Sequence, residues 1–172
     1  MKKTFFFLLT FSMKIVFAQH NLTAAPWHDK VEGALALIQK HEPVIYETIK
    51  TSYIQVGAIS GENEIHAWAF AFKETRYNKI IPWIMLDSKA LTDFTVKNIA
   101  GLVLHEAIHL VYWDKGVDGK IHYSKSNADM KDEHTYIFNY QLNFLKKINA
   151  SKNDLEFCLD IMRYLKLNIY NN

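Results

Sequence analysis

The feature that most constrains this chain is a pair of histidines inside a long apolar segment. Residues 105–109 are His-Glu-Ala-Ile-His, and the flanking segments Ile99–Leu104 and Leu110–Trp113 contain no charged residue. On a helix, positions i and i+4 lie about 40° apart around the axis, so His105 and His109 can point at one ligand. Polar groups in such surroundings are costly to bury unless they have partners. The segment therefore predicts a buried helix that carries a polar site.

The composition of the chain is typical of one globular domain. Its 172 residues, 49% of them hydrophobic, are enough to bury one substantial core. A formal net charge of +2 is too small to favour a nucleic acid or an anionic membrane as partner. Cys158 is the single cysteine, so no disulfide can form within the chain. Its apolar helical surroundings predict a buried side chain.

The first 18 residues have the pattern of a signal peptide. Met1–Lys3 supplies the positive start, Phe5–Phe11 the apolar stretch, and Val16–Ala18 a cleavage site before Gln19. Lys14 interrupts the apolar stretch, which argues against a membrane-spanning helix. We therefore expect residues 19–172 to form the mature domain. This domain would be secreted or periplasmic, with no stable membrane insertion after cleavage.

The first part of the mature domain has a helical pattern followed by strands. Residues 27–52 carry apolar residues at helical spacing, and Pro43 is expected to split this helix. Tyr53–Ile59 and Ile65–Phe72 are strand-like segments on either side of a turn at Gly61. We expect these two strands to pair in antiparallel fashion.

A third strand and a helix start precede the histidine segment. Ile80–Leu86 is strongly apolar, and Pro82 within it favours an edge position or the start of a strand. Thr92 or Asp93 is suited to cap the helix that continues through residues 105–109.

The remainder of the chain predicts a loop and two helices. Glycines and aspartates mark a loop at residues 114–119, and helices are expected over residues 131–148 and from a cap at Ser151 to about Tyr170. The predicted fold class is α+β. It comprises a small antiparallel or mixed sheet of about three strands, packed with the histidine-bearing helix and two C-terminal helices.

At residues 105–109 the chain resembles the zincin metallopeptidases, whose signature is HExxH. The resemblance covers this helix well and the other elements in outline. It implies a zincin-like fold, Zn²⁺ as cofactor, and His105 and His109 as zinc ligands. It further implies that Glu106 is the general base that activates a zinc-bound water to hydrolyse a bond in a peptide or protein substrate. By the same analogy, Ile80–Leu86 would be the edge strand along which the substrate lies.

The subgroups of zincins differ in their third protein ligand. Metzincins use a histidine six residues after the second one, but this chain has Lys115 at that position. Gluzincins use a glutamate from the next helix, and Glu133 fits this pattern, so a gluzincin-like site with Glu133 as third ligand is predicted. Aspzincins use an aspartate that follows a glycine in the loop after the motif, and Asp118 matches this pattern only loosely. Four further candidates for this ligand remain: His134, His122, Asp118 and Asp129.

A zinc peptidase also benefits from a hydrogen-bond donor that stabilises the oxyanion of the transition state. Histidine and tyrosine commonly serve this purpose. The chain offers four candidates near the predicted site, and the sequence does not rank them: His134, His122, Tyr123 and Tyr136.

Three functions remain open from the sequence. The first is an exported zinc metallopeptidase, which the presence of Glu106 favours because metal binding alone does not require this residue. The second is a zincin-like module that binds zinc, has little or no hydrolytic activity, and acts as a binding or inhibitory protein. The short chain favours this alternative. The third is a zinc-free helical interaction protein, in which His105 and His109 are structural.

Overall fold

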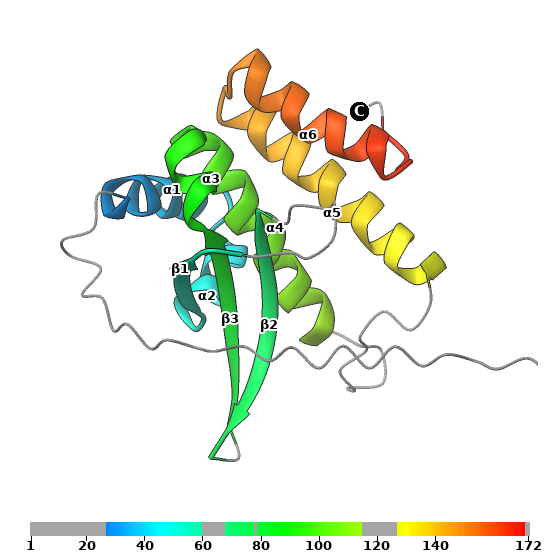
Figure 1. The fold of residues 1–172 in the computed structure, drawn as a ribbon. Helices are drawn as coiled ribbons and strands as arrows, with labels where there is room; N and C mark the ends of the chain where they lie inside the picture. Colours follow the sequence, from blue (N-terminus) through cyan, green and yellow to red (C-terminus); the bar gives the residue numbers. More distant parts are fainter. Residues whose placement is uncertain (1–26, 60–67, 78, 115–126, 171–172) are drawn as a thin grey trace, which may run out of the picture.

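The computed structural model describes residues 27–59, 68–77, 79–114 and 127–170, and the side chains of 113–114 and 127–130 lie outside this description. Within these ranges the chain forms six helices and a three-stranded mixed sheet, which confirms the α+β class (Figure 1). The elements are α1 (His28–His41), α2 (Pro43–Lys50), β1 (Tyr53–Gly57), β2 (Ala69–Arg76), β3 (Lys79–Asp87), α3 (Ser88–Asp93), α4 (Val96–Asp114), α5 (Asn127–Lys147) and α6 (Lys152–Tyr164). The predicted signal peptide (1–18) lies outside the described residues. No described helix is long and apolar enough to cross a membrane.

The predicted interruption of the first helix at Pro43 is confirmed. Pro43 occupies the first turn of α2, where its missing N–H costs nothing, and Glu42 joins the two helices in a non-helical conformation. The break lets α1 and α2 both pack against α4.

The pairing of the strands differs from the prediction. The sheet order is β1-β3-β2, with β1 parallel and β2 antiparallel to β3, so the expected β1–β2 pairing is wrong. The expectation that Ile80–Leu86 is an edge strand is also wrong, because β3 is central. β3 contains the fully buried Ile84 and Leu86, and a central position buries such residues best.

Pro82 is accommodated in the central strand by the register. Pairing of β1 with β3 begins at Tyr53↔Trp83, so Pro82 has only β2 beside it, opposite Lys73. At this point β3 has one free side, and a residue without an N–H is tolerated there. The ribbon formed by β2 and β3 extends beyond β1 and projects from the body of the molecule (Figure 1).

The helix with the histidines begins later than expected. Thr95, rather than Thr92 or Asp93, precedes it, and the Thr95 hydroxyl accepts a hydrogen bond from the N–H of Asn98 at 3.1 Å. Thr92 and Asp93 instead belong to the short helix α3, which breaks before α4 starts.

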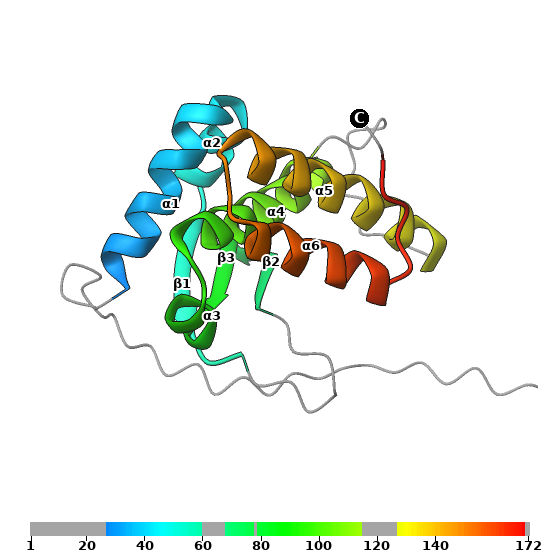
Figure 2. The same cartoon turned by 90° about the horizontal axis from the view of Figure 1, so that it is seen from above.

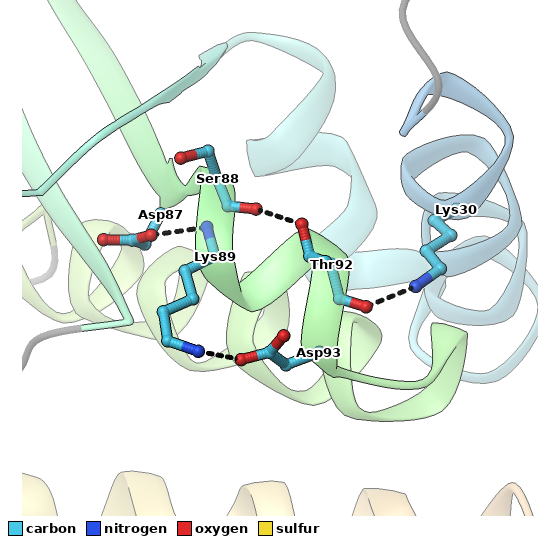
Figure 3. A network of polar contacts seen from close by, with 6 residues as sticks. All are labelled: Lys30, Asp87, Ser88, Lys89, Thr92 and Asp93. Atoms are coloured by element: carbon cyan, nitrogen blue, oxygen red, sulfur yellow. Dashed lines mark hydrogen bonds and ion pairs between the residues drawn. The ribbon is translucent and has the colours of Figure 1, made fainter.

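The helix α3 is held at both ends by polar contacts (Figure 3). The Asp87 carboxylate caps its start by accepting a hydrogen bond from the N–H of Lys89 at 2.6 Å. At its end, the Lys30 ammonium on α1 donates to the carbonyl of Leu91 at 2.8 Å, to that of Phe94 at 3.1 Å and to that of Thr92 at 3.3 Å. These contacts fix the turn from which α4 departs.

The helix α4 forms the centre of the molecule. Residues 99–110 are all buried, and α1 and α2 pack on one side of the helix while α5 packs on another (Figure 2). The predicted cap at Ser151 is confirmed, since Ser151 and Asp154 form a reciprocal capping box at the start of α6. This helix ends at Tyr164, earlier than expected. Cys158 is fully buried, as predicted.

Candidate metal centre

Three polar side chains of α4 are buried within the core. His105, Glu106 and His109 are each exposed by 7% or less, and the two imidazole centroids lie 5.0 Å apart. The spacing i, i+4 places both rings on the side of α4 that faces α5.

A third histidine approaches this pair from α5. One ligand atom from each of His105, His109 and His134 lies within 4.8 Å of the other two. Among the described residues, these three form a group that could hold a metal ion. His134 was one of the reserve candidates for the third ligand and one of the candidates for oxyanion stabilisation.

Glu133, the predicted third ligand, has a different contact. Its Oε1 lies 2.6 Å from Nδ1 of His109, and its side chain is 9% exposed. Glu133 is not one of the three residues whose ligand atoms converge. A carboxylate accepts hydrogen bonds, so this contact holds the proton of His109 on Nδ1 and places the ring lone pair on Nε2.

Gln141 makes the matching contact with His105, and the sequence analysis missed it. The Gln141 amide oxygen lies 3.0 Å from Nδ1 of His105 and can only accept, so Nδ1 is the donor. Gln141 is 1% exposed. Its position was recoverable from spacing, because His134, Phe138 and Gln141 follow the i, i+4, i+7 pattern of one helix face.

Gly101 makes room for this contact. A Cβ at Gly101 would lie 3.1 Å from Nε2 of Gln141 and 3.2 Å from Cδ2 of Leu145. Both distances are tighter than an ordinary van der Waals contact, so with a side chain here Gln141 and Leu145 would have to shift by a few tenths of an ångström. The glycine, one turn before His105, therefore allows the close approach of α4 and α5.

Burial shifts the protonation of two site residues. The pKa of His105 lies well below its ordinary value of 6.5, first because of burial and then because of the neighbouring His109. The imidazole is thus neutral, which is the form that binds metals. Burial raises the pKa of Glu106 from 4.5 to about 7, and His109 and a hydrogen bond from the backbone of Ala71 on β2 partly oppose this rise. A carboxylate with this pKa is suited to exchange protons near neutral pH.

Tyr136 is the one remaining candidate whose side chain the structure describes, and it lies apart from the cluster. Tyr136 is 42% exposed, and its ring contacts those of Tyr112 and Tyr140 at centroid distances of 5.5 and 6.1 Å. His122, Tyr123 and Asp118 lie outside the described residues, as does the side chain of Asp129.

An open cavity of about 300 Å³ borders the cluster; we call it the histidine cavity. Its polar lining consists of the three histidines, Glu106 and Gln141. Its apolar lining comes from the start of β2 and from α4, α5 and α6, and includes Trp68, Phe70, Leu102, Phe138, Ile161 and Leu165. A small ligand can therefore reach the buried imidazoles.

Comparison of the chain with protein-family models, with curated proteins and with solved structures finds no match. The inference of function therefore depends on the side chains of the site and on their geometry.

Proposed function

We propose that the protein is an exported zinc-dependent metallopeptidase with a zincin-like fold. Its zinc ligands would be His105, His109 and His134, with Glu106 as the general base. The observation that carries this proposal is the convergence of three imidazoles within 4.8 Å beside an open cavity. The signal-peptide pattern of residues 1–18 supports export.

The residues present fit a catalytic zinc ion. Three nitrogen ligands leave one position open, as catalytic zinc sites require. Metal-binding histidines usually donate their second N–H to an oxygen acceptor, and His105 and His109 both do so. We therefore revise the role of Glu133 from ligand to positioning residue, with Gln141 as its counterpart. The site then differs from the gluzincin pattern in its third ligand.

The side chains of the site divide the chemistry between them. A bound zinc ion would act as a Lewis acid toward water and toward the substrate carbonyl. Glu106 would take a proton from the attacking water and return it to the leaving amine, which its pKa near 7 permits. Glu133 and Gln141 would keep the two imidazoles of α4 in one tautomer and one orientation.

One observation favours the alternative of a zinc-binding module without hydrolysis. Glu106 accepts a hydrogen bond from the backbone of Ala71, so it ties α4 to the edge strand β2 whether or not catalysis occurs. The presence of Glu106 is therefore explained without a reaction, and an experiment has to separate the two functions.

The variant Glu106→Gln distinguishes the metallopeptidase from the zinc-binding module, because glutamine can still accept the hydrogen bond from Ala71 but cannot take up a proton. We expect zinc content near one ion per chain in both proteins and a rate of peptide hydrolysis lowered by roughly 10²–10⁴-fold in the variant. An unchanged rate would remove Glu106 as the base. Zinc binding without hydrolysis by the native chain would favour the binding module, and absence of zinc would exclude both metal functions.

A further inference from the structure

The wall of the histidine cavity is apolar wherever it is not part of the proposed metal site. Trp68 directly precedes β2, Phe70 lies on β2, Leu102 on α4 and Phe138 on α5. Among the lining residues that the structure describes, Glu106 is the single carboxylate, and there is no lysine or arginine. An acidic side chain that entered the cavity would find no lysine or arginine to pair with among these residues.

Two apolar residues at the C-terminal end of α6 and directly after it line the cavity. Ile161 packs against the hydrophobic core, while Leu165 follows the last turn of the helix and is 37% exposed. The N–H of Leu165 donates to the carbonyl of Ile161 at 2.9 Å, which holds the two residues together. Leu165 is thus a wall residue that the core does not require.

The size of the cavity limits what it can take. Its volume of about 300 Å³ lies at the lower end of the range of roughly 300–1,000 Å³ found for small-molecule sites. This is room for one large side chain together with part of the backbone that carries it.

We propose that the histidine cavity binds a large uncharged side chain, such as leucine, methionine or phenylalanine, next to the bond that is cleaved. Leu165, which directly follows α6, is a specificity-determining residue for this side chain. The inference rests on the proposed metallopeptidase function and names its substrate class. An apolar pocket of this kind discriminates by burial of apolar surface, and the absence of a lysine or arginine among the described lining residues disfavours acidic side chains.

Binding of three hydroxamates to the zinc-loaded protein tests this without requiring turnover. The probes are acetohydroxamate, 3-phenylpropanohydroxamate and succinohydroxamate, which share the metal-binding group and differ in the group that enters the cavity. Isothermal titration calorimetry should show the phenyl compound binding roughly 10–200-fold more tightly than acetohydroxamate. Succinohydroxamate should bind no more tightly than acetohydroxamate.

Two variants at the end of α6 identify the residue responsible. Leu165→Lys should remove most of the preference for the phenyl compound and improve binding of succinohydroxamate. Tyr164→Lys adds the same charge at the neighbouring position, which is 69% exposed and does not line the cavity, and should leave all three affinities unchanged.

The outcomes separate this inference from the function on which it rests. Equal affinities for the three hydroxamates in a protein that holds zinc would overturn the apolar pocket and leave the metal site standing. A preference that persists in Leu165→Lys would overturn the role of Leu165. A protein that binds no zinc would overturn the metallopeptidase function, and the substrate class would fall with it.

Discussion

Two cavities of nearly equal volume lie at opposite edges of the sheet and differ in their chemistry. The histidine cavity beside β2 measures about 300 Å³, and a second cavity between α1, α2 and β1 measures about 310 Å³; we call the latter the α1–β1 cavity. The charged side chains of the α1–β1 cavity, Glu32 and Lys50, are more than half exposed. The polar groups of the histidine cavity are largely buried, and several are held by hydrogen bonds. Volume alone therefore does not indicate a site; buried polar groups with fixed orientations do.

The sharpest test of this difference is removal of one imidazole. His109→Ala should weaken zinc binding by roughly 1,000-fold or more, since a structural zinc site is worth about 10–16 kcal/mol and each ligand carries several of these. Competition with a chelator measures the affinity. His41→Ala, at the end of α1, is the matched control. If both variants bind zinc equally, the histidine cluster is structural and the contrast between the cavities disappears.

A substitution in the α1–β1 cavity should change the stability of the protein and not its binding of zinc. Ile49 lines it and is 3% exposed, so Ile49→Ala should lower the free energy of unfolding by about 2–5 kcal/mol. Zinc affinity should stay unchanged. Val44→Ala on the same helix removes a side chain that is 78% exposed and should change stability by less than about 0.5 kcal/mol. Urea unfolding of the three proteins measures this. A loss of zinc affinity in Ile49→Ala would show that the two cavities are coupled.

The buried carboxylate predicts an unusual dependence of stability on pH. The pKa of Glu106 is raised in the native state from 4.5 to about 7, so between these values the native protein holds a proton that the unfolded chain has released. Stability should therefore fall as pH rises from 4.5 to 7, by up to about 3 kcal/mol in the metal-free protein.

This pH effect is isolated by comparison with Glu106→Gln, which lacks the titrating group. The depressed pKa of His105 acts in the opposite direction, costing stability as pH falls below about 6.5. It is present in both proteins and largely cancels in their difference. Urea unfolding at pH 4.5 and pH 8 gives the four free energies. An identical pH dependence in both proteins would contradict the raised pKa of Glu106 and the burial that causes it.

The smallest effect distinguishes a positioning residue from a ligand. Glu133→Gln should lower zinc affinity by roughly 10–100-fold, as removal of a partner of a metal-binding histidine does. His134→Ala should lower it more, like His109→Ala. Asp132→Asn, at the exposed neighbouring position of α5, is the control. Suppose that Glu133→Gln lowers zinc affinity as much as His109→Ala does, while His134→Ala lowers it only slightly. Glu133 would then be the third ligand, and its assignment as a positioning residue would be wrong.

The sequence predicted the half of the site that depends on local geometry. His105 and His109 share one helix, and the spacing i, i+4 fixes their relation whatever surrounds them. Glu133 and His134 are neighbours on α5, and adjacent helical positions point about 100° apart. Both contact His109 on α4, but which of them converges with the two imidazoles as a third ligand depends on how α5 is rotated, and that is set by the packing of residues such as Ile137 and Phe138. The residue pattern of one helix does not determine this rotation.

The errors in the sheet have the same origin. The expected hairpin of β1 and β2 relied on their closeness in the sequence, whereas β1 pairs in parallel with the later strand β3. This pairing depends on which strand has the most apolar surface to bury on both sides. The helix caps, by contrast, depend on one or two neighbouring side chains. The cap at Ser151 was accordingly predictable, and that of α4 was misplaced by only two or three residues.

The two hydrogen bonds between α4 and α5 also select the register in which these helices pack. His105 with Gln141 and His109 with Glu133 join antiparallel helices at two points, at the close approach that Gly101 permits. A slide of α5 by one turn, about 5.4 Å, would break both pairs together and take one hydrogen-bond partner from each of four buried polar groups. Each such group costs about 1–3 kcal/mol. The two hydrogen bonds therefore favour one register of the helix pair. In this register His134 lies beside the other two imidazoles, so correct folding also assembles the histidine cluster.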